Sequence, residues 1–449
     1  MTDSRRHAVG RFGWLLLPIV VGGTLVAGLI AAAVAITLRV TMLVITPPKT
    51  KAEEVVVLAV DRAEGTVTLS DHVDAIVPGS YSLYFSGSAG RAKIGDILRH
   101  GEGSVTRRLL AEERGTLRRN IPARVSGWFY SSPGEFPYEH EDTVVQTDLG
   151  HAAAWLFPAR RPDVPGVVKR GVVQPGAIRP GVIRHDVIEH WVIQVHGRGV
   201  DRTEALRAVP VFHEAGYTSL LISYRNDGVA PASDDGRYAL GDTEWRDVDA
   251  AMRFALDRGA TDIVLMGWSM GGALVLQAAT RSAVRSVVRG VILDSPVVDW
   301  VTVLNHQAGS MRIPKWVRSA AYTLISRPWG RLFTGQSAAI DLDRLDFVRR
   351  AGELTTPILL MHSESDNYVP SSASRELAKL RPDIVTFESF SGAGHTRLWN
   401  YDQDRWNGAI GAWLSGLKPT KRGVTPPTSR EPVASSVRGE PTSPATEVG

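Results

Sequence analysis

Six short runs of apolar residues, separated by segments long enough for helices, constrain the fold of this chain more than any other feature of its sequence. Uninterrupted apolar runs of this length are typical of parallel strands whose two faces are both buried. Residues 242–258, between the second and third runs, have apolar side chains at helical spacing and predict a crossover helix. We therefore expect an α/β domain over residues 142–417, with a mostly parallel sheet flanked by helices. The predicted strands lie at residues 191–195, 219–223, 263–266, 290–293, 357–361 and 384–387.

Composition excludes several kinds of chemistry. The 449-residue chain has no cysteine, so it can form neither a disulfide nor a thiolate nucleophile nor a cysteine-ligated metal site. Its 51 Lys and Arg residues nearly balance 47 Asp and Glu residues and are scattered, so we expect no nucleic-acid partner. The HExxH, phosphate-loop and dinucleotide-binding motifs are absent, and we expect no metal and no cofactor. Any catalysis must then rest on Ser, His and carboxylate side chains.

One long uncharged segment lies near the N-terminus. Residues 14–38 carry no charge, and at about 1.5 Å per residue a helix of this length crosses a hydrocarbon core of about 30 Å. The segment exceeds the roughly 7–15 apolar residues of a cleaved signal peptide, so we expect an uncleaved single-pass membrane anchor. Basic residues precede the segment, and by the positive-inside rule we predict a cytoplasmic N-terminus at residues 1–13. The rest of the chain would then lie on the outer side of the cell membrane. The nearby basic residues are Arg5, Arg6 and Arg11 before the segment and Arg39, Lys49 and Lys51 after it.

Residues 50–140 contain short strand-like runs separated by Gly and Asp turns, which predict a small β-rich accessory domain. A mixed-charge stretch within it, residues 107–119, is interpreted as a solvated helix or loop. Since we find no convergent polar cluster there, a spacer or packing domain is the favoured interpretation.

Two further segments lack the apolar pattern of a packed element. Residues 163–184 repeat a Gly-apolar-apolar-basic pattern with period five, which matches no known solenoid, and we expect an irregular surface segment. Residues 418–449 are rich in Pro, Ser and Thr, and we expect a disordered tail.

Ser269 is the candidate nucleophile. It occupies the centre of a G-x-S-x-G motif, between Gly267 and Gly271, directly after the predicted strand 263–266 and before a helical segment. A five-residue match carries little weight alone, but a strand before it and a helix after it are the context in which a serine projects above a sheet. Glycines fit both flanks because such a turn is strained and brings backbone segments together. The backbone N–H of Met270 would then face a developing oxyanion.

A second oxyanion donor should follow an earlier strand. Gly197 and Arg198 come directly after strand 191–195, and the backbone N–H of Arg198 is our candidate. His196 precedes the nucleophile in the chain, so we assign it a turn-packing role and not that of the base.

A candidate acid and a candidate base follow Ser269 in the chain. Asp366 lies on the loop after strand 357–361, where it could orient an imidazole and stabilise its charged form. Glu364 is the rival acid on the same loop. His395 follows strand 384–387 in a glycine-containing loop, which could present it to Ser269 as the general base.

Taken together, these residues make the region 142–417 resemble the α/β-hydrolases, in particular prolyl-oligopeptidase-like and membrane-anchored lysophospholipase-like serine hydrolases. The resemblance implies an α/β-hydrolase fold and the cofactor-free cleavage of esters, thioesters or peptides. Residues 50–140 are far too short for the propeller of the oligopeptidases. Supporting matches are His196-Gly197, the run Ser-Tyr-Arg-Asn-Asp at 223–227, Asp294-Ser295-Pro296, and Asp366 with Val369-Pro370.

The resemblance also implies a small cap over the nucleophile at about residues 296–350. Its aromatic residues could form the core of the cap or an apolar wall for an acyl group. We predict a serine esterase of the carboxylesterase or lysophospholipase type, acting on an acyl-ester or lipid-like substrate. A serine peptidase of the same fold and a non-catalytic membrane scaffold are the alternatives, and the sequence does not specify an oligomeric state. The aromatic residues are Trp300, Trp316, Tyr322, Trp329 and Phe333.

Overall fold

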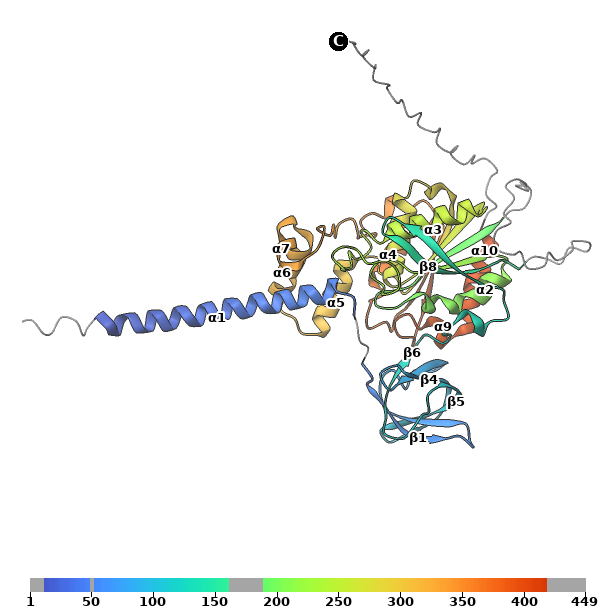
Figure 1. Ribbon diagram of the computed structural model, residues 1–449, viewed down its shortest axis with the longest axis horizontal. Helices are drawn as coiled ribbons and strands as arrows, with labels where there is room; N and C mark the ends of the chain where they lie inside the picture. The colour runs from blue at the N-terminus through green and yellow to red at the C-terminus, as the bar shows by residue number, and fades with distance from the viewer. Residues whose placement is uncertain (1–11, 49–51, 161–188, 418–449) are drawn as a thin grey trace, which may run out of the picture. The chain divides into compact units, whose positions relative to one another are not determined.

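The computed structural model describes residues 12–48, 52–160 and 189–417. The glycine-repeat segment, the C-terminal tail and most of the predicted cytoplasmic N-terminus lie outside the described residues. Figure 1 shows a long N-terminal helix, a small all-β unit and an open sheet covered by helices.

Helix α1 (Phe12–Ile45) is longer than the predicted span of residues 14–38. It continues past Arg39 because that side chain is exposed and the residues after it are again apolar. It ends just before Pro47, since a proline disfavours helical backbone at the residue that precedes it. The stretch Gly28–Ile45 is long and apolar enough to cross a membrane, judged by length and composition.

The β-rich segment forms a closed six-stranded barrel of order β1-β2-β5-β4-β3-β6. Our interpretation of residues 107–119 as a solvated helix or loop is wrong, because β5 occupies most of that stretch. Arg107 on β5 is fully buried, and its guanidinium donates hydrogen bonds to the carbonyls of Gly95, Ala75, Val77 and Gly79. The strands are β1 (Val55–Asp61), β2 (Thr66–Ser70), β3 (Tyr81–Phe85), β4 (Gly90–Gly101), β5 (Ser104–Arg114) and β6 (Pro122–Ser126).

An eight-stranded sheet of order β14-β13-β12-β11-β9-β10-β8-β7 forms the second β structure. The strands from β9 to β14 pair in parallel, whereas β7 and β8 form an antiparallel hairpin at one edge. The expected α/β class with a mostly parallel sheet is confirmed. The strands are β7 (Glu141–Thr147), β8 (Gly150–Phe157), β9 (His190–Val195), β10 (Thr218–Ile222), β11 (Asp262–Trp268), β12 (Val288–Asp294), β13 (Ile358–Ser363) and β14 (Val385–Phe390).

Helices cover both faces of this sheet. On β11, Ile263 and Leu265 pack into one core with α3 and α4, whereas Val264 and Met266 pack into another with α2, α9 and α10. The alternation explains why the central strands are apolar throughout. The helices are α2 (Val209–Glu214), α3 (Trp245–Asp257), α4 (Met270–Arg281), α5 (Trp300–Ser310), α6 (Lys315–Ser326), α7 (Arg331–Thr334), α8 (Ser372–Leu380), α9 (Leu398–Tyr401) and α10 (Gln403–Gly416).

Helices α5, α6 and α7 lie in the insertion between β12 and β13. Trp300 is buried, and its indole donates to the carbonyl of Leu240 at 2.7 Å. Trp316, Trp329 and Phe333 are exposed, so these three do not form a core for the cap.

Candidate active site

Ser269 occupies the sharp turn between β11 and α4. Its backbone has φ 51° and ψ −117°, outside the regions that residues with a side chain normally adopt. The backbone N–H of Ser269 donates to the carbonyl of Asp294 at 3.1 Å, which ties the turn to the end of β12. The residue is only 6% exposed, so its hydroxyl lies largely shielded from water.

The flanking glycines are required by space and not by their own backbone angles. A Cβ on Gly267 would lie 2.4 Å from the carbonyl oxygen of Gly271, and one on Gly271 would lie 2.2 Å from the carbonyl oxygen of Val195. Backbone atoms cannot yield as a flexible side chain would. The strained backbone conformation is therefore that of Ser269, whereas the two glycines allow α4 and β9 to approach the turn.

We expect Gly271→Ala to destabilise the fold by about 3 kcal/mol or more, since the added methyl group overlaps backbone atoms of β9. Gly411→Ala in α10 is the matched control, because nothing lies within 4 Å of its added Cβ. The free energy of unfolding of that control should rise by about 0.5–1 kcal/mol, because alanine lowers the conformational entropy of the unfolded chain. Denaturant unfolding of both variants checks the pair, and equal stabilities would contradict the spatial explanation.

His395 lies between Ser269 and Asp366. Its Nε2 is 2.9 Å from Ser269 Oγ, and its Nδ1 is 2.7 Å from Asp366 Oδ2. A carboxylate only accepts hydrogen bonds, so the Nδ1 atom carries the proton and Nε2 is free to accept from the hydroxyl. Such an array can pass the serine proton to the imidazole. The structure thus brings together three side chains that are far apart in the sequence.

Asp366 is held as an ionised acceptor. Its Oδ1 accepts the backbone N–H groups of Tyr368 and Val369, both at 2.9 Å. Burial would raise the pKa of the Asp366 carboxyl, but the charge of His395 and the hydrogen bonds from His362 and His395 outweigh it and lower that pKa. The carboxylate therefore stays charged next to the imidazole.

A lowered pKa makes Asp366 a source of stability in the pH range where it is ionised. That contribution is complete above the ordinary Asp pKa of about 3.9 and disappears as pH falls toward the lower folded-state pKa. We expect the melting temperatures of wild type and Asp366→Asn to differ at about pH 5 and to approach each other as pH falls below about pH 4. Thermal scans at fixed ionic strength check this, and a gap unchanged in acid would contradict it.

His362 is a functional candidate that sequence reasoning missed. It is fully buried near the end of β13, and its Nε2 lies 3.0 Å from the carbonyl of Val369 and 3.3 Å from Asp366 Oδ2. Its Nδ1 lies 2.8 Å from Ser374 Oγ. It supports the turn that holds Asp366. A polar ring inside an apolar strand was the available signal, because a buried imidazole needs partners.

Glu364, the rival acid, lies elsewhere. Its carboxylate pairs with Arg375 and accepts the hydroxyls of Ser371 and Ser389, each at 3.1 Å. Among the described residues no hydrogen bond joins it to His395.

Two backbone N–H groups near Ser269 have no acceptor among the described residues, those of Met270 and Arg198. Gly197 brings the second loop close, since a Cβ there would lie 3.2 Å from the Cβ of Ser269. The N–H of Gly197 itself donates to Glu204 Oε2 at 2.7 Å and is therefore occupied. Backbone N–H groups without an acceptor are the kind of group that can stabilise a developing oxyanion.

The side chain of Arg198 joins this loop to the end of α1. Its guanidinium donates to the carbonyls of Leu43 and Thr46, each at 2.8 Å, and of Val44 at 3.1 Å. These carbonyls have no partner within the helix, and a cation is favourable at a helix C-terminus.

His196 is fully buried and does not hydrogen-bond to Ser269. Its Nδ1 lies 2.9 Å from the carbonyl of Gly197, its Nε2 lies 3.2 Å from Asp227 Oδ2, and its ring stacks on Tyr224. It holds the ends of β9 and β10 together.

The barrel contacts the segment that follows His395. Arg397 Nη1 donates to Asp74 Oδ1 at 2.6 Å, and Asn400 Nδ2 donates to the carbonyl of Ser80 at 2.8 Å. Gly79 fits against Asn400 so closely that a Cβ there would lie 1.9 Å from its carbonyl oxygen. The barrel therefore contacts the site domain and is not a detached spacer.

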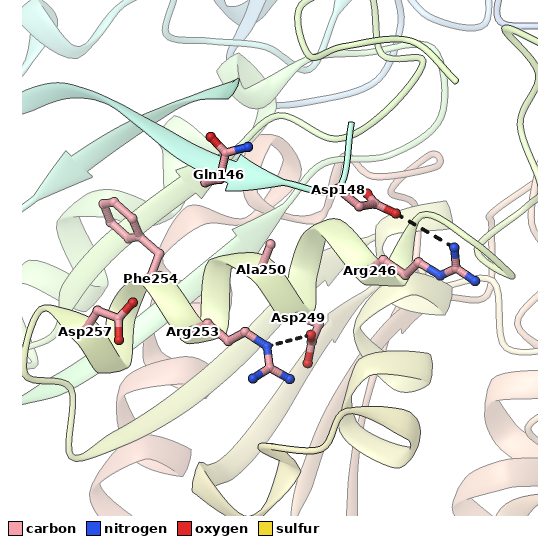
Figure 2. Close-up of a pocket in the computed structure, with 8 residues that line it drawn as sticks. All are labelled: Gln146, Asp148, Arg246, Asp249, Ala250, Arg253, Phe254 and Asp257. Atoms are coloured by element: carbon pink, nitrogen blue, oxygen red, sulfur yellow. Dashed lines mark hydrogen bonds and ion pairs between the residues drawn. The ribbon is translucent and has the colours of Figure 1, made fainter. Parts of the chain in front are cut away.

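A separate depression of about 500 Å³ lies along the outer face of α3 (Figure 2). Its charged side chains pair with one another, as Arg253 does with Asp249 at 3.0 Å and Arg246 with Asp148 at 3.8 Å. None of the predicted site residues lines it.

The mostly parallel sheet, with a strained serine turn between its central strand and the next helix, defines the α/β-hydrolase class of fold. In agreement, residues 192–409 match a family described as "Alpha/beta hydrolase family", while residues 56–126 match a "Domain of unknown function (DUF8805)". Residues 192–409, slightly under half of the chain, are thus an α/β-hydrolase domain. None of the curated proteins matches the sequence.

Several solved structures are similar to this chain at low identity. The esterase Pf2001 of Pyrococcus furiosus is 16% identical over 64% of this chain and 95% of its own, with a TM-score of 0.44. The esterase RhEst1 from Rhodococcus sp. ECU1013 is 15% identical over 63% and 100%, with a TM-score of 0.39. A Mycobacterium tuberculosis puromycin-hydrolyzing peptidase is 17% identical over 80% and 52%, with a TM-score of 0.42.

Proposed function

We propose that the chain is a membrane-anchored serine esterase in which Ser269, His395 and Asp366 act as a catalytic triad. The observation that carries the proposal is the continuous pair of contacts from Asp366 Oδ2 to His395 Nδ1 at 2.7 Å and from His395 Nε2 to Ser269 Oγ at 2.9 Å. A non-catalytic scaffold has no need of this alignment.

The reaction proceeds in two steps. Ser269 Oγ attacks the ester carbonyl while His395 Nε2 takes its proton, and the N–H groups of Met270 and Arg198 stabilise the oxyanion. The C–O bond to the alcohol then breaks, the alcohol takes the proton from His395, and an acyl-enzyme remains. Water repeats the sequence and releases the carboxylic acid. Asp366 stays ionised throughout and stabilises the imidazolium.

An acyl-ester or lipid-like substrate of the carboxylesterase or lysophospholipase type suits this chain best. The support is α1, which is long and apolar enough to anchor the enzyme beside lipid. We further propose that α1 crosses the cell membrane once and that the hydrolase domain lies on the outer side. Protease accessibility of the hydrolase domain in intact cells tests that orientation.

Labelling and substrate comparison test the proposed activity. The full chain in detergent should react with a fluorophosphonate at Ser269 and hydrolyse acyl esters faster than matched peptide substrates. A folded protein that no fluorophosphonate labels would favour the scaffold alternative. Turnover of peptides alone would favour a serine peptidase.

A further inference from the structure

A patch of exposed apolar side chains lies on and beside α6 and α7. We name it the cap patch; a monomer normally leaves few large apolar side chains this open side by side. The indole of Trp329 and the ring of Phe333 meet edge to face with centroids 6.2 Å apart. Its members and their exposed fractions are Met311 57%, Trp316 55%, Trp329 52%, Leu332 86% and Phe333 56%.

The charged residues of the cap sequence itself are all basic. Between Trp300 and Ile340 the sequence has five basic residues and no acidic one, although the whole chain is nearly neutral at +4. Exposed aromatic and aliphatic side chains combined with basic ones are typical of helices that lie in a membrane interface, where anionic head groups attract the basic residues. The five are Arg312, Lys315, Arg318, Arg327 and Arg331.

The helices that carry the cap patch pack against α1. Figure 1 shows α6 and α7 beside α1, and both helices contact it. On α1, Thr37, Thr41 and Ile45 are buried, four residues apart on one face, whereas Leu29 and Ile30 remain exposed. The uncharged span ends at residue 38, so the buried face of α1 begins where its apolar span gives way to Arg39. That position is the level of the lipid head groups if the uncharged residues 14–38 are the part of α1 that crosses the bilayer.

We propose that the cap patch docks into the head-group boundary of the bilayer that α1 crosses, with a preference for anionic lipid. The proposal rests on the membrane part of the proposed function. Docking would hold the candidate active site at the lipid surface, because α5 leads into the cap and contacts the acid loop. His306 Nε2 on α5 lies 2.9 Å from the carbonyl of Asn367, next to Asp366.

Single-cysteine labelling tests the docking, because the natural chain has no cysteine. The full chain carrying Leu332→Cys is labelled with an environment-sensitive fluorophore and placed in nanodiscs, one chain per disc. We expect a blue-shifted emission that a lipid-bound quencher reduces and aqueous iodide does not. Leu380→Cys on α8, 48% exposed, is the matched control and should show the opposite behaviour. Equal iodide accessibility at both positions would overturn the proposal.

Charge variants test the lipid preference. The reporter is again the labelled Leu332→Cys chain, and the reference is its quenching by the lipid-bound quencher in discs that contain anionic lipid. We expect that quenching to fall by about twofold or more in discs of zwitterionic lipid alone. The double change Lys315→Glu and Arg318→Glu should lower it by a similar factor in discs with anionic lipid. Identical quenching in all three cases would overturn the electrostatic part. If the label is protected from iodide only in discs that hold two chains, a second copy of the chain, and not lipid, covers the cap patch.

The two proposals can fail separately. The fluorescence measurement with labelled Leu332→Cys can be repeated on a chain that also carries Ser269→Ala. It should give the same emission and quenching, because docking does not depend on turnover. If the chain hydrolyses esters but the label on Leu332→Cys is exposed to water, the docking proposal is wrong and the proposed esterase stands. If the label is buried in lipid but the wild-type chain hydrolyses no ester, the proposed esterase is wrong and the docking proposal stands.

Discussion

Replacing Ser269 with alanine should lower kcat toward an acyl ester by roughly 10⁶-fold, close to the rate that remains when a whole triad is removed. The reason is that the hydroxyl is the only atom of the array that can form the bond to the acyl carbon. His395 and Asp366 keep their 2.7 Å contact in this variant but have nothing to activate. Single-turnover kinetics with a chromogenic ester in detergent measure the change.

Ser295→Ala is the matched control for that experiment. Ser295 is also buried and also has positive φ, 50°, but its hydroxyl bonds Asp294 Oδ1 and the N–H of Thr396 and not His395. Losing these hydrogen bonds should change kcat by less than about tenfold, since neither of them reaches His395 or Ser269. Comparable losses in both variants would mean that Ser269 acts through structure and not as the nucleophile.

Asp366→Asn should lower kcat by about 10⁴-fold with little change in the fold. An asparagine amide can donate to His395 Nδ1, which favours the imidazole tautomer with its proton on Nε2. That tautomer cannot accept the proton of Ser269. The variant also loses the negative charge that stabilises the imidazolium, so kcat should fall more than KM changes. Steady-state kinetics across several ester concentrations separate the two parameters.

Glu364→Gln provides the control for Asp366, because Glu364 lies on the same loop and pairs with Arg375 instead. We expect its kcat to stay within about threefold of wild type, as for other exposed ion pairs. If Glu364→Gln were the more damaging change, the assignment of the acid would be wrong.

Much of the fold could be predicted because buried parallel strands have an apolar signature on both faces. The run before Ser269 is of this kind, and β11 occupies it. Ser269, Asp366 and His395 each follow a predicted strand, and loops at the carboxyl ends of parallel strands converge. Local pattern and topology therefore point to the same three residues.

Other features depend on contacts that a sequence pattern does not encode. Arg107 looks solvated by charge alone, yet four converging carbonyls satisfy it inside the barrel. The support that His362 gives to Asp366 depends on how the loop after β13 folds back. The exposure of Trp316 could not be predicted either, because an apolar residue is usually assigned to a core.

The segment before the sheet touches both loops on which the proposed chemistry depends. The end of α1 binds Arg198, whose N–H is one of the two proposed oxyanion donors, and the barrel contacts the residues that follow His395. A form of the chain that lacks α1 would therefore keep the barrel contacts of the His395 loop, but its Arg198 guanidinium would lack the carbonyl partners on residues 43, 44 and 46. We expect such a form to differ from the full chain in turnover, because the loop that carries the Arg198 N–H would be less firmly held.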